Sequence, residues 1–280
     1  MAEVDLVVNT FERTYREVLG ADLLLEIERT NLSSFARRVA LINNVDDRAD
    51  AERMAHDAVQ RGAITHYAFV ADRLPQALEQ TGVKTEEFGP IGHYTDWALT
   101  ATCLEGSPWL LCWDADTRLA EPCDWIAPAI ELMERDPRVM VVSPCPVQAR
   151  DGQASADFSL DRELERSGDF ALTQGFSDQL FLCRREELAA PIYHERCIAR
   201  WRYPMAAIAP IFEARVDSWM RHHDRLRGVH LSSAFEHPRD KEGLGHMPHI
   251  PRQRLLRLAG IVLYAALRRL PLRPRCCRVL

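Results

Sequence analysis

The chain has 280 residues, 47% of them hydrophobic and 27% charged, which is ordinary for a globular protein with a substantial core. Its net charge of −6 hides an asymmetry, because residues 251–280 carry eight arginines and no acidic residue. The first 250 residues hold the other 27 basic groups against all 41 acidic ones, which argues against a broad basic surface for nucleic acid on the body of the protein.

The sequence has few features that indicate secretion or a membrane span. No segment reaches the roughly 18 consecutive apolar residues that a membrane span needs. Glu3 and Asp5 interrupt the N-terminus, unlike a secretory signal. The eight cysteines contain no CxxC pair, so we expect reduced, mostly buried thiols of a cytoplasmic protein.

Strands and helices alternate along most of the chain. In order, the patterns predict strand 4–9, a helix continuing to Leu25, strand 39–47, helix 49–61, strand 66–72, helix 93–105, strand 109–113, helix 125–135, strand 139–143, strand 176–184, helix 211–221 and strand 228–237. Such alternation predicts an α/β fold with a largely parallel sheet. The polar residues 148–156 predict a loop that separates two halves, 1–147 and 157–250, of one continuous domain, 1–250.

The most informative motif is the pair Asp114 and Asp116, which directly follows the apolar run 109–113. If the strand continues, alternation points both carboxylates to one side. Two carboxylates about 4 Å apart repel by about 4 kcal/mol at an effective dielectric near 20, and a divalent cation removes this repulsion. Mg²⁺ or Mn²⁺ carrying a phosphorylated substrate is the natural ligand. An Asp-x-Asp pair by itself is also common in solvated turns, so its place after a buried strand decides the interpretation.

Later in the chain, helix 211–221 carries Glu213 and Asp217 four residues apart, and hence on one face. The following strand delivers His237 to a sheet edge. Asp178 and Gln179 stand where substrate hydroxyls could be bound.

The order of these parts, over residues 4–238, resembles GT-A glycosyltransferases of the family 2 type. The features that carry the resemblance are the Thr-x-Glu-Arg sequence after the first strand, a second strand ending in Asn/Asp, a third ending in Asp72, the Asp-Ala-Asp motif, the carboxylate-bearing helix and the final histidine. The resemblance implies a Rossmann-like mixed, mostly parallel sheet flanked by helices. It also implies metal-assisted transfer of a sugar from a nucleotide-diphosphate donor to an acceptor hydroxyl of a carbohydrate or glycoconjugate, inverting by single displacement.

By the same resemblance, each site residue has an expected role. The donor contacts are Thr10, Phe11, Glu12, Arg13, Asn44 or its neighbours, Asp72, Asp96, Asp114 and Asp116. Asp114, Asp116 and His237 would bind Mn²⁺ or Mg²⁺, with His237 a better fit than His230 because it ends the apolar run. Glu213 is the expected base, and Asp217 is the second choice.

Two departures from the family pattern keep alternatives open. The usual adjacent Glu-Asp pair is replaced by Glu213 and Asp217, and Glu213 could instead pair with Arg215 or Arg221. Residues 92–98 also lack the basic diphosphate contact of many relatives. A non-catalytic nucleotide- or glycan-binding relative is therefore one alternative. A sugar nucleotidyltransferase is another, although residues 10–13 contain no glycine, and a haloacid-dehalogenase-like phosphatase fits less well because Thr117 directly follows Asp116.

Residues 251–280 form a basic amphipathic C-terminal tail, and residues 251–270 within it predict a helix of about 30 Å. One face is apolar, with Leu255, Ala259, Val262, Leu263, Ala266 and Leu270, and arginines lie opposite. Such a segment can lie on an anionic membrane surface, which would make the protein peripheral on the inner face of the membrane. It can equally pack on the acidic body or on a second subunit.

Overall fold

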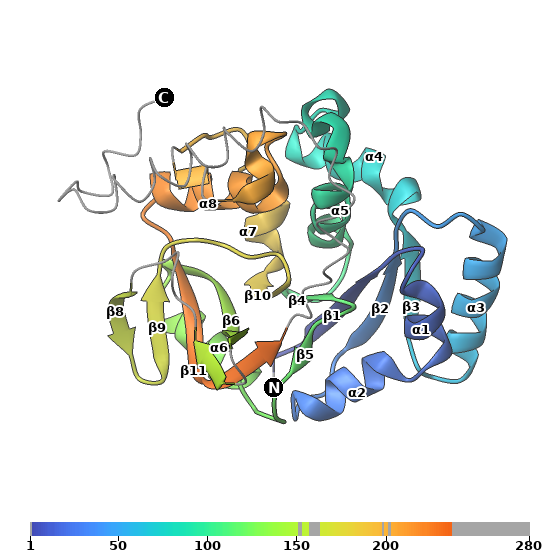
Figure 1. Cartoon of the computed structure of the whole chain (residues 1–280), viewed down its shortest axis with the longest axis horizontal. Coiled ribbons are helices and arrows are strands. Elements are labelled where there is room, and N and C mark those ends of the chain that lie inside the picture. Colours follow the sequence, from blue (N-terminus) through green and yellow to red (C-terminus); the bar gives the residue numbers. More distant parts are fainter. Residues whose placement is uncertain (1, 151–152, 157–162, 198, 201–202, 237–280) are drawn as a thin grey trace.

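The computed structural model describes the whole chain apart from residues 1, 151–152, 157–162, 198, 201–202 and 237–280 (Figure 1). Its strands are β1 (Val4–Thr10), β2 (Arg37–Ile42), β3 (His66–Phe69), β4 (Trp109–Asp114), β5 (Arg118–Leu119), β6 (Val139–Arg150), β7 (Gln153–Ala156), β8 (Glu163–Ser167), β9 (Phe170–Thr173), β10 (Leu180–Arg184) and β11 (Leu226–Glu236). Its α-helices are α1 (Tyr15–Gly20), α2 (Leu23–Thr30), α3 (Arg48–Gln60), α4 (Val70–Thr81), α5 (Asp96–Cys103), α6 (Ile126–Arg135), α7 (Arg185–Ala189) and α8 (Phe212–His222), and its 3-10 helices are η1 (Thr85–Tyr94) and η3 (Pro204–Ala207).

The strands form one mixed sheet in the order β3-β2-β1-β4-β10-β6-β11-β9-β8, with β5 paired to β11 and β7 paired to β6. The first four strands in this order are parallel, as the alternation of strands and helices predicts. From β10 onward antiparallel pairs dominate, although β6 and β11 run parallel. The predicted mixed α/β sheet flanked by helices is confirmed.

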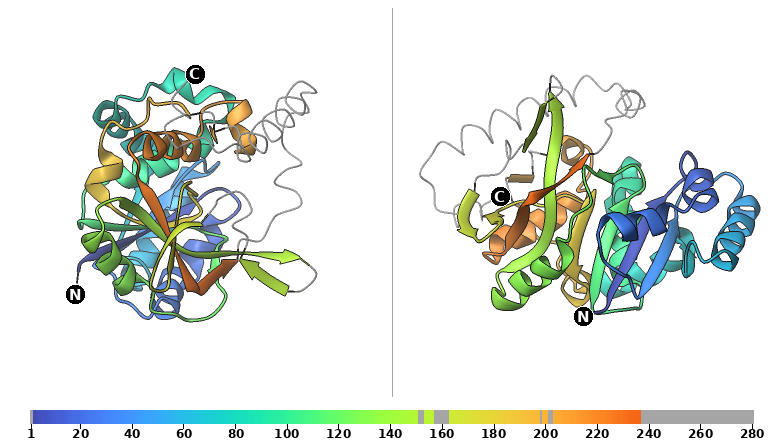
Figure 2. Two further views of the ribbon diagram at one scale, coloured as in Figure 1. Left: turned by 90° about the vertical axis from the view of Figure 1, so that its left-hand side faces the viewer. Right: turned by 90° about the horizontal axis from the view of Figure 1, so that it is seen from below.

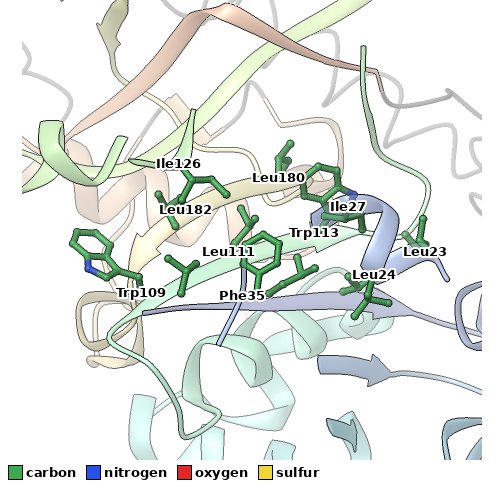
Figure 3. Packing of buried hydrophobic residues seen from close by; sticks show 14 of the residues in the cluster. Leu23, Leu24, Ile27, Phe35, Trp109, Leu111, Trp113, Ile126, Leu180 and Leu182 are labelled. Carbon is green, nitrogen blue, oxygen red and sulfur yellow. The ribbon is translucent and has the colours of Figure 1, made fainter. Parts of the chain in front are cut away.

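Apolar side chains on both faces of the sheet build two main cores. Buried residues of α1, α2, α3 and α6 join the core on one face, and those of α4, α5, α7 and α8 join the core on the other (Figure 1). Figure 3 shows the first core, where Leu111 and Trp113 of β4 lie among side chains of α2 and β10. Burying one such leucine contributes about 1.5–3 kcal/mol, so both faces of β4 are fixed by packing.

The chain order of the parallel strands creates a switch point. From β1 the chain builds outward through β2 and β3, then returns to the other side of β1 to form β4. In open α/β sheets, ligands bind outside the carboxyl ends of the strands at such a point. Here Asn9 of β1 is the register partner of Asp114 of β4.

Several predicted boundaries are wrong. The predicted third strand ends at Phe69, and Asp72 lies in the first turn of α4 instead of at a strand end. The predicted loop 148–156 falls in the β6–β7 hairpin, which projects from the rest of the sheet (Figure 2). The single predicted helix up to Leu25 is two helices, α1 and α2. The division of the domain into two halves stays a prediction.

The predicted basic tail of residues 251–280, with its amphipathic helix over 251–270, lies outside the described residues, and so does His237. Within the described residues, no helix is both long enough and apolar enough to cross a membrane.

Candidate functional site at the switch point of the sheet

The Asp114–Asp116 motif lies in a tight turn at the carboxyl end of β4. The amide N–H of Thr117 donates to the carbonyl oxygen of Asp114 at 2.9 Å, which closes the turn. Trp113 Nε1 and Arg118 Nη1 donate to the Thr117 carbonyl oxygen at 2.9 and 2.8 Å. Trp113 is fully buried, so the turn is anchored in the core while Asp114 and Asp116 keep part of their surface exposed.

Two further carboxyl groups, Asp178 and Glu213, meet beside this turn. The Asp114 amide donates to the carbonyl oxygen of Gln179 at 2.8 Å, which brings the residues before β10 against the end of β4. Glu213, in the first turn of α8, accepts a hydrogen bond at 3.3 Å from the amide of Asp178. Residues from three separate parts of the chain therefore converge on one acidic cluster.

The surroundings of Asp178 affect the pKa of its carboxyl group. Burial is the main cause that raises the pKa of its carboxyl well above the usual range, and the charges of Glu213 and Asp114 and a hydrogen bond with Glu213 act in the same direction. These surroundings favour the neutral form of the Asp178 carboxyl. Asp178 also helps raise the pKa of the Tyr94 hydroxyl, after burial, while Arg13 opposes that shift. Tyr94 and Arg13 thus belong to the same site.

The next part of the candidate site is the end of β1 and the loop that follows it. Thr10 is buried, and its hydroxyl shares a hydrogen bond with that of Thr14 at 3.0 Å. Glu12 accepts from the Asp46 amide at 2.8 Å and from Arg16 at 3.1 Å, so it ties the loop after β1 to the loop after β2. Arg13 is exposed, and its guanidinium lies over the Phe11 ring, 5.6 Å from the ring centroid.

Asn43, rather than Asn44, faces the carboxyl at the start of α5. Asn43 is buried, and its side-chain amide donates to Asp96 at 2.9 Å. Asn44 is exposed and has a φ of +45°, in the left-handed region. Burial is the main cause that raises the pKa of Asp96 to about 6, against the lowering effect of its hydrogen bonds.

Asp72 lies away from the Asp114–Asp116 turn. It forms an ion pair with Arg48, and half of each side chain is exposed. It follows β3, three strands from β4, and neighbouring strands lie about 4.8 Å apart, so the separation across the sheet is about 14 Å. Asp72 therefore does not join the acidic cluster around Asp114.

Asp217 and Glu213 do not have the same surroundings, although they are four residues apart on α8. Asp217 is fully buried and accepts a hydrogen bond at 2.8 Å from Arg221, which also donates to Gln174 at 2.8 Å. A carboxylate engaged in a buried ion pair is a structural group rather than an accessible base. Glu213 remains partly exposed.

The third predicted metal ligand, His237, lies outside the described residues. His230, which the sequence ranked below His237, is buried and hydrogen-bonded to the Ser233 hydroxyl at 2.7 Å. Within the described part of the chain, no group of three or more His, Cys, Asp or Glu residues is arranged to hold a metal ion. The two carboxylates of the Asp114–Asp116 turn are the best candidates.

Sequence reasoning missed that Asp178 meets Glu213, and it missed Tyr94, whereas Asn43 falls within the prediction of Asn44 or its neighbours. The sequence places Asp178 inside a predicted strand over 176–184, but β10 begins only at Leu180, so Asp178 lies just before the strand. Its proximity to Asp114 depends on the antiparallel pairing of β10 with β4, in which Leu180 faces Trp113.

No protein-family profile and no curated protein matches the chain. Solved structures match its fold. GalNAc-T7, solved with UDP, GalNAc and Mn²⁺, superposes with a TM-score of 0.53 at 12% identity over 89% of this chain and 46% of that one. The mannosyltransferase PcManGT from Pyrobaculum calidifontis, solved with GDP-Man and Mn²⁺, gives 0.50 at 14% identity over 98% and 67%.

This chain therefore spans less than half the length of GalNAc-T7. At these identities the likeness concerns the fold, and membership of family 2 stays a prediction. The predicted fold is confirmed: the chain has the GT-A fold found in nucleotide-sugar glycosyltransferases.

Proposed function

We propose that this chain is a glycosyltransferase that moves a sugar from a nucleoside-diphosphate donor to a hydroxyl group of a carbohydrate or glycoconjugate. The observation that carries the proposal is the anchored Asp114–Asp116 turn at the switch point of a GT-A sheet, with Asp178 and Glu213 beside it. Both comparison proteins were solved with a nucleotide and Mn²⁺, which supports the same class of donor here.

The residues fit a divalent cation that is shared with a diphosphate. Asp114 and Asp116 supply hard oxygen ligands, and Mg²⁺ in substrate sites is usually held by one or two carboxylates together with phosphate oxygens and water. A site with two protein carboxylates therefore agrees with the arrangement of the described residues. A cation held there by Asp114 and Asp116 would stabilise the negative charge that develops on the departing diphosphate. His237 is a further candidate ligand.

Glu213 is the proposed base. It removes the proton of the acceptor hydroxyl while that oxygen attacks the anomeric carbon opposite the diphosphate, which gives a single displacement with inversion. The Asp178 amide holds its carboxylate in place at 3.3 Å. Glu213 is partly exposed, whereas burial raises the pKa of Asp178 well above its usual range and favours its neutral form, so Glu213 is the more suitable proton acceptor of the two.

The rest of the donor pocket is assigned to the strand ends around the turn. Thr10 ends β1, and Phe11, Glu12 and Arg13 follow it; all four would contact the nucleotide. The Asn43–Asp96 pair lies at the adjoining ends of β2 and α5 and would contact the base or ribose.

The test is release of nucleoside diphosphate from UDP-, GDP- and dTDP-sugars with Mn²⁺ and mixed acceptors. We expect release with one nucleotide class, and a loss of at least about 100-fold in Asp116→Asn, since the cation and its ligands stabilise the leaving group. Asp72→Asn is the matched control and should retain release, because Asp72 lies away from the cluster.

The other candidate functions give different results in the same assay. A non-catalytic relative binds a donor and releases nothing. A nucleotidyltransferase consumes a nucleoside triphosphate and a sugar phosphate and releases pyrophosphate. Either pattern would overturn the proposal.

A further inference from the structure

Asn9, the penultimate residue of β1, has a buried side-chain oxygen without a partner. The side chain is 6% exposed, and Oδ1 has no hydrogen-bond partner within the described part of the chain. Buried polar atoms in native proteins are almost always hydrogen-bonded, because an unpaired one costs free energy. The unpaired acceptor therefore needs an explanation, and a ligand that donates a hydrogen bond to it is one.

Asn9 lies in the centre of the switch point. β1 lies between β2 and β4, and Asn9 is the register partner of Leu41 on one side and of Asp114 on the other (Figure 1). Side chains alternate along a strand, so Asn9 points to the same face as Val7, which belongs to the core beneath α4, α5, α7 and α8. Asp114 points to this face too, because Cys112 belongs to the same core. Neighbouring strands are about 4.8 Å apart, so the two side chains lie side by side.

Asn43 extends this set of polar side chains toward β2. It directly follows β2, and its backbone N–H donates at 2.8 Å to the carbonyl oxygen of the last residue of β1, so the ladder continues to this point. Its side chain donates to Asp96 at 2.9 Å. The Asn43–Asp96 pair, Asn9 and Asp114 consequently form a polar row across the carboxyl ends of β2, β1 and β4.

The polar row has the same order as the parts of a nucleoside diphosphate. Under the proposed function, the Asn43–Asp96 pair contacts the nucleoside, and Asp114 holds the cation on the diphosphate. The ribose joins the base to the diphosphate, so it would lie between these two contacts, against Asn9. Ribose hydroxyls can donate the hydrogen bond that the Asn9 oxygen lacks.

We propose that Asn9 is a specificity-determining residue, whose side-chain oxygen accepts a hydrogen bond from a hydroxyl of the donor's ribose. The inference rests on the proposed function and deepens it, because it names the part of the donor that β1 recognises. If the 2′-hydroxyl is the partner, the chain discriminates against dTDP-sugars, which carry deoxyribose. A water molecule on the bound cation is the alternative O–H donor, and the experiment separates the two.

The experiment is isothermal titration calorimetry of the full chain with UDP, GDP and the 2′-deoxy and 3′-deoxy form of each, with Mn²⁺ and with chelator. We expect UDP or GDP to bind. One of its two deoxy forms should bind about 10-fold more weakly, because it lacks the hydroxyl that pairs with the buried oxygen of Asn9. The other deoxy form should bind nearly as tightly as the parent nucleotide.

The variant Asn9→Leu replaces the amide by an apolar group of similar shape. It should bind the parent nucleotide about 10-fold more weakly and no longer distinguish it from the deoxy form. A purely structural role would weaken all the nucleotides alike and leave their ratio unchanged. Asn9→Ala, which removes the same oxygen with a smaller side chain, should give the same loss of discrimination, and circular dichroism checks the folding of both variants.

Thr173→Val is the matched control. Thr173 Oγ1 is also buried without a partner in the described part of the chain, but β9 is the fourth strand from β4 in the sheet. This variant should keep the full discrimination between the parent nucleotide and its deoxy form.

The inference is overturned if the wild type binds the parent nucleotide and both deoxy forms equally, or if the discrimination survives in both Asn9 variants. A loss in Asn9→Leu that is equal for all the nucleotides and disappears with chelator would assign the oxygen to a metal-bound water instead. In these cases the nucleotide still binds, so the proposed function stands. Binding of neither UDP nor GDP would overturn the inference together with the donor class on which it rests.

Discussion

Asp96 shows how one residue connects burial to a measurable pH dependence. Its pKa is raised to about 6 in the folded protein, chiefly by burial, against about 3.9 for an unperturbed aspartate. Between these values the folded state binds a proton that the unfolded state does not. The free energy of unfolding therefore falls as pH rises from about 4 to about 6, and this contribution is level above that range.

The variant Asp96→Asn removes this titration and keeps an oxygen that can accept from Asn43. We expect the stability of the variant relative to wild type to increase by about 2 kcal/mol between pH 4 and pH 7. Urea unfolding at several pH values measures the difference. Profiles that run parallel across this range would show that Asp96 titrates normally.

Glu213 and Asp178 make a second prediction at the scale of the residue. Loss of a general base lowers a rate by about 10²–10⁴-fold, so Glu213→Gln should lose transfer by that factor and keep donor affinity. Asp178→Asn replaces a carboxyl whose neutral form is favoured by burial with a neutral amide of similar shape, so it should lose much less. Initial rates of the two purified variants decide the assignment, and the opposite order would make Asp178 the base.

At the scale of the element, α8 is stabilised by a buried ion pair between two side chains that are four residues apart. Asp217 is fully buried and Arg221 is 8% exposed, with Nε and Oδ1 2.8 Å apart. Removing one partner of such a pair leaves an uncompensated charge and costs about 3–5 kcal/mol. Asp217→Asn should therefore lower the free energy of unfolding by that amount.

The double variant Asp217→Asn with Arg221→Gln provides the control, because it removes both charges. It should be less destabilised than the sum of the two single variants. Urea unfolding of all four proteins measures the coupling. A single Asp217 variant as stable as wild type would contradict the structural role and revive Asp217 as a candidate base.

Elements also show where sequence patterns succeed and fail. The apolar run of β4 is buried on both faces, so strand and motif were predictable together. Phe69 passes directly into α4 with no turn residue between them, so nothing in the sequence marks Asp72 as helical. The sequence of the β6–β7 hairpin is polar, which is why it was predicted as a loop. The Asp-Gly pair between its two strands is, however, itself a signal for a hairpin.

At the scale of the whole molecule, the alternation of strands and helices predicted the sheet, and with it the edge where the site lies. Which acids meet there depends on pairings between distant segments, and β10 against β4 is the decisive one. A single sequence contains no periodicity that reports such a pairing. The Asp114–Asp116 turn was therefore predictable, whereas the Asp178–Glu213 pair needed the structure.

The central claim is a metal-assisted donor site at the Asp114–Asp116 turn. The most direct measurement is the melting temperature of the purified chain with UDP-, GDP- and dTDP-sugars, each with Mn²⁺ and with chelator. A donor at 100 times its dissociation constant adds about 2.7 kcal/mol of stability. The account predicts a rise with one nucleotide class that needs the metal, is absent in Asp116→Ala and persists in Asp72→Asn. A rise that is unaffected by chelator and by Asp116→Ala, or no rise with any donor, would contradict it.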